Sequence, residues 1–181
     1  YRKYVGVEPT PALAAYARQV SGALIVEESL PELNSIQDGA FDQTFSMHVL
    51  EHSTGFAEAR SWCAEMLRVT RVGGYVCVAA PDIRDYGSFF WDGDWTHGYP
   101  TTPQRISQIF DDLGFRPAYA GVMHLGRTGG AAAFGGHIGF AIIPTRLVDL
   151  FTNRMVGRPL ASGLKIACLW GLCFVVVRKT G

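Results

Sequence analysis

The sequence predicts an α/β protein built on a doubly wound, mostly parallel sheet. Short β-branched or apolar runs alternate with segments of helical period through the first 81 residues, and the tail contains one long apolar run. Strands that alternate with helices form βαβ units, whose right-handed crossovers join parallel strands. The tail, residues 166–179, is expected to close the sheet as its last strand. A length of 181 residues suits a single domain over 1–181.

The remaining strands are expected where short apolar runs meet turn residues. Their ranges are 3–9, 22–29, 41–47, 75–81 and 116–126. The run at 75–81 follows an expected turn at 71–74, which reads RVGG. The residues that follow these runs lie at the carboxyl edge of the sheet, where open α/β sheets bind ligands.

The helices are expected where apolar residues recur every three or four positions. Their ranges are 11–20, 56–69, 102–115 and 145–156. Pro11 suits a first helical turn, Thr102 is a candidate N-cap and Gly114 a helix stop. On the first helix the apolar residues that follow the helical period are Leu13, Tyr16, Ala17 and Val20. On the second, one helical face contains Phe56, Ala59, Cys63, Met66 and Leu67.

Two stretches without a regular period are expected to be active-site or lid loops. Residues 82–101 are rich in aromatic residues, Gly and Asp, and residues 127–144 are rich in Gly and Ala. Long irregular segments inside a compact domain are uncommon and tend to bind ligands. The aromatic residues of the first stretch could form an acceptor pocket or anchor the loop: Tyr86, Phe89, Phe90, Trp91 and Trp95.

Charge and cysteine content exclude several classes of protein. The 16 Lys and Arg balance the 16 Asp and Glu, so no nucleic-acid partner is indicated. The apolar run 166–177 is too short to span a bilayer, which takes about 20 residues. The four cysteines form no CxxC pair, which favours free thiols in a reducing compartment and a cytoplasmic protein. The oligomeric state is left open.

Carboxylates follow the first two strands. Glu8 follows the first, and Glu27 and Glu28 follow the second. A carboxylate accepts two hydrogen bonds from a ribose diol, and a second one accepts from an adenine amine. Ser46, Met47 and His48 end the third strand. The set indicates a nucleoside-binding edge.

Four segments together resemble the class I S-adenosylmethionine-dependent methyltransferases, which are Rossmann-like. They read VGVEPTPALAAYA, EESLP, FDQTFSMHVLEHS and EMLRVTRVGGYVCVAAPD. The resemblance implies S-adenosylmethionine as cofactor and an antiparallel C-terminal strand. It implies that Glu8 holds the ribose hydroxyls with Pro9 near the adenine, and that Glu27 or Glu28 lies near the adenine amine. It also implies that Ser46, Met47 and His48 run beside the methionine moiety.

The sequence departs from this family in two places. Val26 stands where the family has an acidic residue, and the family's glycine-rich loop after its first strand is missing. We expect that strand and loop to lie upstream of Tyr1. Two alternatives remain open: a catalytically inactive methyltransferase-like module for binding or assembly, and an NAD-dependent dehydrogenase.

His97 and His52 are the candidate catalytic residues. His97 lies in the 82–101 segment beside Asp94, and an Asp-oriented histidine is a suitable general base. His52 either takes part directly or orients the loop, and Glu51 is expected to be structural. No recognised ligand spacing supports a metal site at His48, His52, Asp94 and His97, so none is predicted. The expected reaction is methylation of a small-molecule hydroxyl, with a sugar or glycan precursor as the suggested class.

Overall fold

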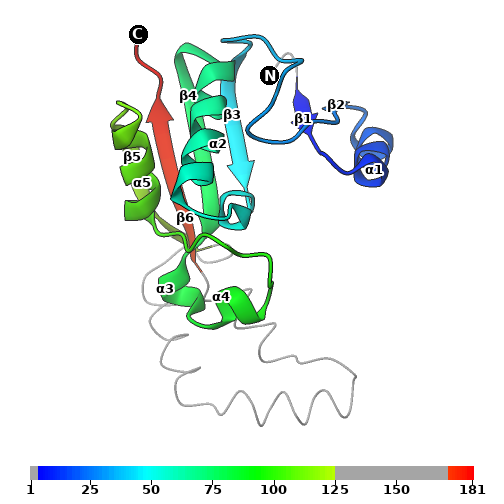
Figure 1. Cartoon of the computed structure of the whole chain (residues 1–181). Helices are drawn as coiled ribbons and strands as arrows, with labels where there is room; N and C mark the ends of the chain where they lie inside the picture. The colour runs from blue at the N-terminus through cyan, green and yellow to red at the C-terminus, as the bar shows by residue number, and fades with distance from the viewer. Residues whose placement is uncertain (1–3, 125–170) are drawn as a thin grey trace, which may run out of the picture.

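The computed structural model describes residues 4–124 and 171–181 (Figure 1). The strands are β1 (Val5–Val7), β2 (Leu24–Val26), β3 (Phe41–Met47), β4 (Thr70–Pro81), β5 (Pro117–His124) and β6 (Gly171–Arg178). The helices are α1 (Pro11–Ser21), α2 (Phe56–Val69), α3 (Ile83–Tyr86), α4 (Phe89–Asp92), α5 (Pro103–Asp112) and the 3₁₀ turn η1 (Leu50–His52). The expected loop at 127–144, the helix at 145–156 and Cys168 lie outside the described residues.

Four strands form the main sheet in the order β3-β4-β6-β5. β3 is parallel to β4, and β6 runs antiparallel to both of its neighbours. Val175, Val177 and Cys173 of β6 are fully buried, because this strand lies between β4 and β5. The mixed α/β fold with an antiparallel C-terminal strand is therefore confirmed.

The turn expected at 71–74 lies inside β4. Phe41 pairs with Thr70, and two residues later Gln43 pairs with Tyr75. The step is two residues on β3 and five on β4, so the extra residues of β4 form a wide irregularity in the ladder. The glycines produce a bulge here because Gly73 adopts a φ of +80°, which favours a residue without a Cβ.

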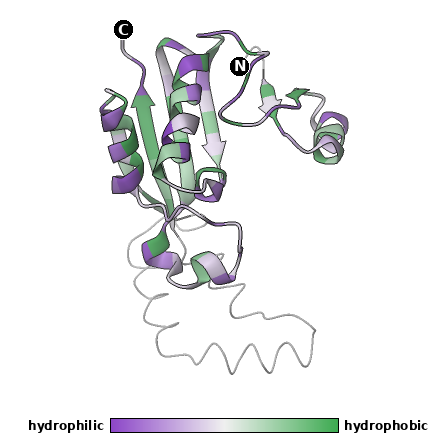
Figure 2. Cartoon of the chain, in the orientation of Figure 1, coloured by the Kyte–Doolittle hydropathy of each residue, from purple (hydrophilic) through white to green (hydrophobic). Residues whose placement is uncertain are grey.

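Helices α2 and α5 cover one face of this sheet, with their green, apolar sides toward it in Figure 2. The apolar face of α2 is mostly buried: Ala59, Cys63, Met66 and Leu67 are buried, whereas Phe56 at its first position is 46% exposed. α5 contributes Ile106, Ile109 and Phe110, all fully buried. Thr102 caps α5 as expected, its side chain accepting a hydrogen bond from the Arg105 N–H.

The unit β1-α1-β2 stands apart from the main sheet (Figure 1). β1 and β2 pair in parallel as a two-stranded sheet of three residues each. The apolar residues of α1 do not form a buried face, because Leu13, Tyr16 and Val20 are each more than half exposed and Ala14 alone is buried. Two short strands present too little surface to cover a helix face, and no second layer from the described residues lies over it.

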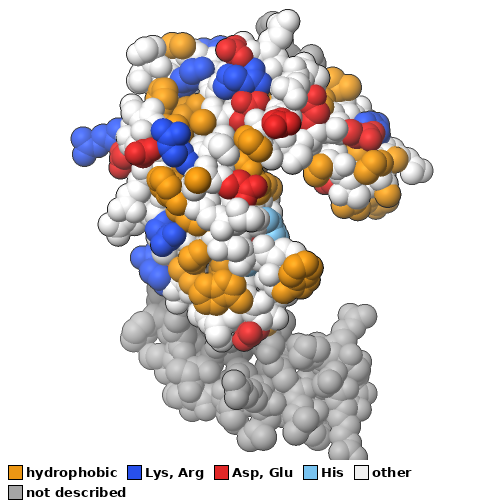
Figure 3. Space-filling model, in the orientation of Figure 1, with side chains coloured by type: hydrophobic (Ala, Val, Ile, Leu, Met, Phe, Trp, Pro, Cys, Tyr) orange, Lys and Arg blue, Asp and Glu red, His pale blue; other side chains and the backbone are white. Residues whose placement is uncertain are grey.

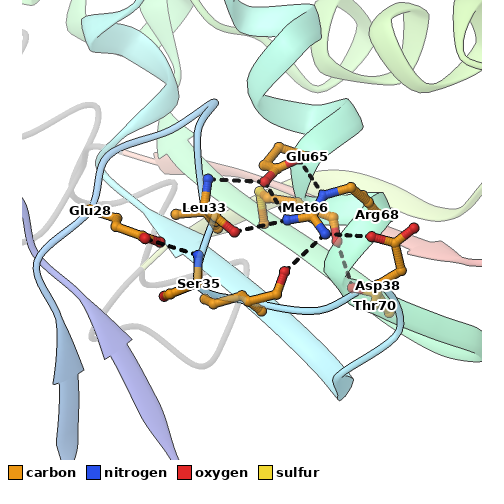
Figure 4. A network of polar contacts seen from close by, with 9 residues as sticks. Glu28, Leu33, Ser35, Asp38, Glu65, Met66, Arg68 and Thr70 are labelled. Carbon is orange, nitrogen blue, oxygen red and sulfur yellow. Dashed lines mark hydrogen bonds and ion pairs between the residues drawn. The ribbon is translucent and has the colours of Figure 1, made fainter.

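The segment between β2 and β3 is tied to α2 by Arg68 (Figure 4). Its guanidinium donates to both carboxylate oxygens of Glu65, to Asp38 and to the carbonyls of Leu33 and Ile36. The pKa of Glu65 is lowered, mainly by the hydrogen bonds from Arg68. This network is the firmest polar connection between the segment and the sheet layer.

The 82–101 segment is less irregular than expected. It contains the one-turn helices α3 and α4, and Asp82 caps α3 by accepting from the Arg84 N–H. The Ile83 N–H donates to the Thr101 carbonyl, which closes the base of the segment. A helix of four residues is too short to give a recognisable period, so the sequence pattern missed both. No helix in the described ranges is both long enough and apolar enough to cross a bilayer.

Candidate functional site

The candidate cofactor carboxylates lie after β1 and β2, but their surroundings differ. Glu8 Oε1 accepts from the Thr10 N–H at 2.9 Å, and no group among the described residues donates to Oε2. Glu27 forms an ion pair with Arg18 at 2.6 Å. Glu8 is thus the carboxylate best placed to accept hydrogen bonds from a ligand.

The Glu28 side chain reaches Ser35 in the segment before β3 (Figure 4). Its Oε1 accepts from the Ser35 N–H at 2.9 Å, and its Oε2 is buried without a hydrogen-bond partner among the described residues. Because its first oxygen braces a loop, Glu28 has a structural role independent of any ligand. Pro9 lies exposed beside Glu8.

The end of β3 turns sharply at His48. Ser46 is buried and Met47 is 46% exposed, as successive residues of a strand point to opposite faces. The His48 N–H still continues the ladder by donating to the Ala79 carbonyl, but its φ is +54°, in the left-handed region. This turn directs the chain into η1, so Ser46 and Met47 alternate along the strand while His48 lies beyond its end.

Glu51 is the buried centre of the site. Its carboxylate is fully buried, and Oε1 lies 3.2 Å from His48 Nδ1. This hydrogen bond raises the pKa of His48 more than burial lowers it. The Glu51 carbonyl accepts from the N–H groups of Gly98 and Tyr99, which joins η1 to the 82–101 segment. A Cβ on Gly98 would lie 2.6 Å from the Ser53 carbonyl oxygen, so only glycine fits this approach.

His52 and His97 lie ring against ring, with centroids 4.9 Å apart. The expectation that Asp94 orients His97 is wrong in its detail. The close partner of His97 Nδ1 is the Phe90 carbonyl at 2.5 Å, whereas Asp94 lies 3.9 Å from Nε2. Asp94 instead accepts from both the N–H and the hydroxyl of Thr96. Its two hydrogen bonds from Thr96 lower the pKa of Asp94.

Thr96 is a site residue that sequence reasoning missed. Its Oγ1 lies 2.7 Å from His52 Nδ1, so it connects Asp94 to His52. The spacing Asp94-Trp95-Thr96 is typical of an Asx turn and was the available signal. The contact to His52 spans 44 residues and depends on the tertiary fold, so the spacing alone could not indicate it.

The aromatic residues of this segment divide into anchors and exposed groups. Phe90 is fully buried and packs on the His97 ring at 4.6 Å. Trp91 and Trp95 are 47% and 90% exposed. In Figure 3, histidine surface borders the hollow between the β1-α1-β2 unit and the α3-α4 region. Phe90 therefore serves to fix His97, while the two tryptophans remain available for contact.

The chain is similar to known proteins in part of its sequence and in its fold. Residues 1–78 match the sequence model of a family described as a methyltransferase domain. The match covers less than half of the chain, and it supports the resemblance to methyltransferases that the sequence shows. The described residues share the α/β fold of the solved methyltransferases that follow. No curated protein is similar enough to match the sequence.

Solved structures with this methyltransferase fold align with nearly the whole chain. A complex of the Haloferax volcanii Trm112 methyltransferase activator with a methyltransferase is 15% identical, at a TM-score of 0.64, covering 99% of this chain and 72% of that one. A SAM-dependent methyltransferase from Archaeoglobus fulgidus is 17% identical, at 0.62, covering 97% and 75%. Geranyl diphosphate methyltransferase in complex with SAM is 12% identical, at 0.60, covering 98% and 69%.

Proposed function

We propose that the protein transfers the methyl group of S-adenosylmethionine to the hydroxyl of a small-molecule acceptor, with a sugar or glycan precursor as the first class to test. The observation that carries the proposal is the pair His52 and His97, which lies at the carboxyl edge of the sheet beside the end of β3. The domain is proposed to extend over 1–181, with residues 82–101 covering the acceptor.

The residues at the edge of β1 fit the proposed cofactor. Glu8 is half-buried, and only one of its carboxylate oxygens is used by Thr10, which suits the acceptance of ribose hydroxyls. Pro9 lies next to it near the expected adenine. Glu27 would need to release Arg18 before it could accept from an adenine amine. The cofactor supplies an electrophilic methyl group on a sulfonium centre, and the chain supplies binding, orientation and a proton acceptor.

His97 is proposed as that proton acceptor. Its Nδ1 is held by the Phe90 carbonyl, which leaves Nε2 to take the proton that the acceptor hydroxyl loses as it becomes a methyl ether. His52, held by Thr96, is proposed to position the hydroxyl. The buried Phe90 ring fixes His97, so little reorganisation is needed at the moment of transfer.

The cysteines bear on the proposed location of the protein and on its reactivity. The described cysteines Cys63, Cys77 and Cys173 are all free, which is compatible with the proposed cytoplasmic location. Burial raises the pKa of the Cys63 thiol to about 12, so it is expected to be unreactive.

Calorimetry with S-adenosylhomocysteine tests the cofactor role of Glu8. We expect Glu8→Ala to weaken binding roughly 10- to 100-fold, because hydrogen bonds to a charged group contribute about 1.5–3 kcal/mol. Glu32→Ala, at an exposed carboxylate of the next segment, is the matched control and should bind as wild type. Equal affinity in both variants would contradict the ribose role.

Transfer of labelled methyl to a panel of sugars, sugar conjugates and phenols tests the reaction. We expect His97→Gln to lower kcat by about 10²- to 10⁴-fold with unchanged cofactor affinity, as loss of a general base does. If the wild-type protein binds the cofactor yet labels none of the acceptors, the inactive binding or assembly module becomes the better account.

A further inference from the structure

Glu51 lies close to the His52–His97 pair, so three potential metal ligands are grouped together. Glu51 and His52 come from η1, and His97 comes from the segment after α4. Each offers one ligand atom, and these three atoms all lie within 4.8 Å of one another. We infer that Glu51, His52 and His97 bind a divalent transition-metal ion of the Zn²⁺ class. This inference goes beyond the proposed methyl transfer and does not depend on it.

The hydrogen bonds of His52 leave its Nε2 as a bare nitrogen. Thr96 has a single hydroxyl proton, and it donates that proton to the Asp94 carboxylate. The Thr96 oxygen must therefore accept from His52 Nδ1, which lies 2.7 Å away. With the proton on Nδ1, the neutral imidazole carries a lone pair on Nε2, the form in which histidine binds metals.

His97 is fixed in the same tautomer by a different partner. A carbonyl only accepts, so the 2.5 Å contact between His97 Nδ1 and the Phe90 oxygen places the proton on Nδ1. Metal-bound histidines in proteins typically donate their second N–H to a carbonyl or another acceptor in this way. The Asp94 carboxylate 3.9 Å from His97 Nε2 adds negative charge near that nitrogen.

Glu51 provides the independent observation that points to a ligand. Its side chain is fully buried, and Oε2 has no hydrogen-bond partner within the described part of the chain. Oε1 is used by His48 at 3.2 Å. A buried carboxylate oxygen without a partner is costly, and coordination to a cation would remove that cost.

Two histidines and one carboxylate form a recognised type of zinc site, in which a fourth position stays open. Tetrahedral bonds of about 2.0–2.1 Å place ligand atoms roughly 3.4 Å apart, so the three side chains need to close by up to about 1.4 Å on binding. His97 Nε2 would then hold either a proton or the ion. With the ion bound, a hydroxyl in the open position would be acidified by coordination.

Titration of the chelator-treated full chain with Zn²⁺ by calorimetry, and with Co²⁺ by visible absorption, tests the site. We expect one ion per chain and the ligand-field bands of a four- or five-coordinate Co²⁺. Glu51→Gln, His52→Ala and His97→Ala should each weaken binding at least 100-fold. Thr96→Val removes no ligand but loses the group that orients His52, and should weaken binding about 10- to 100-fold.

Asp92→Ala is the matched control, because it removes an exposed carboxylate of the same segment and leaves the three ligands and their hydrogen-bond partners in place. It should bind both ions within about threefold of wild type, and circular dichroism checks that each variant is folded. A wild-type chain that binds neither ion would overturn the inference. So would equal binding in the wild type, His52→Ala and Thr96→Val, which would indicate adventitious binding by surface groups.

Discussion

The β1-α1-β2 unit and the main sheet layer contain helices with similar sequence patterns, but the two helices differ in how far their apolar faces are buried. α1 and α2 both have an apolar face at helical spacing. In α2 that face is buried against β4, whereas in α1 Leu13, Tyr16 and Val20 remain exposed. A period predicts which side of a helix is apolar, but a second layer of structure decides whether that side is buried. The described layer over α2 is a four-stranded sheet, and the layer beneath α1 is two strands of three residues.

Core truncation should separate the two regions most strongly. Phe110→Ala, in the fully buried face of α5, should lower the free energy of unfolding by about 3–5 kcal/mol. Tyr16→Ala on the exposed face of α1 should change it by about 0.5 kcal/mol or less. Denaturant unfolding measures both. A cost for Tyr16→Ala close to that for Phe110→Ala would show that α1 is covered in solution.

Loss of Arg68 should release the segment that joins the two regions. Arg68→Ala removes the donor to the Ile36 carbonyl and one of the two donors to the Leu33 carbonyl. It also leaves the Glu65 carboxylate, 12% exposed, with the Leu33 N–H and without its charged partner. We expect a loss of about 2 kcal/mol, typical of charge-assisted hydrogen bonds. Arg71→Ala is the control, because its partner Asp42 is 80% exposed, and it should cost less than about 1 kcal/mol. Equal midpoints for the two variants in urea would contradict this role of Arg68.

The two threonine N-caps give a smaller contrast. Thr102 accepts a hydrogen bond at the start of α5, while Thr10 before α1 makes no side-chain cap bond. Thr102→Ala should therefore lower the free energy of unfolding by about 1 kcal/mol and Thr10→Ala by close to zero. Thermal unfolding distinguishes them, and a larger shift for Thr10→Ala would be inconsistent with the capping geometry.

The smallest expected effect is a pH dependence at Glu65. Its pKa is lowered in the folded state, so its stabilisation is present above the unfolded pKa near 4.5 and is lost as pH falls through the lowered folded value. Glu65→Gln should therefore be less stable than wild type at neutral pH, and the gap should narrow on acidification below about pH 4.5. A gap that stays constant from pH 7 to pH 3 would argue against the Arg68 contact as its source.

Much of the main layer was predictable because its signals are local. Thr102 and Gly114 bracket α5, and the apolar runs of β3 and β6 are long enough to be recognised. The short α3 and α4 were missed, since four residues carry no period. The bulge at Gly73 was interpreted as a turn, because sequence shows the glycine but not the partner strand.

Sequence indicated the histidines of the candidate site but not the hydrogen bonds that hold them. His52 and His97 were selected from sequence, and the structure brings their rings together. The roles of their neighbours were not, because Asp94 reaches His52 through Thr96 and Phe90 holds His97 through its carbonyl. Every residue has a backbone carbonyl, so the sequence cannot indicate which carbonyl will accept a hydrogen bond. Such a partner is known only once the fold is known.

The left-handed φ of His48 has a consequence for how this turn tolerates change. Any residue with a Cβ bears about 1–2 kcal/mol to adopt that conformation, whereas glycine adopts it freely. Backbone strain considered alone would therefore favour the replacement of His48 with glycine. Glycine would relieve the backbone strain but would remove the imidazole that hydrogen-bonds to Glu51. At this position the residue with the least backbone strain therefore lacks the side chain that the site uses.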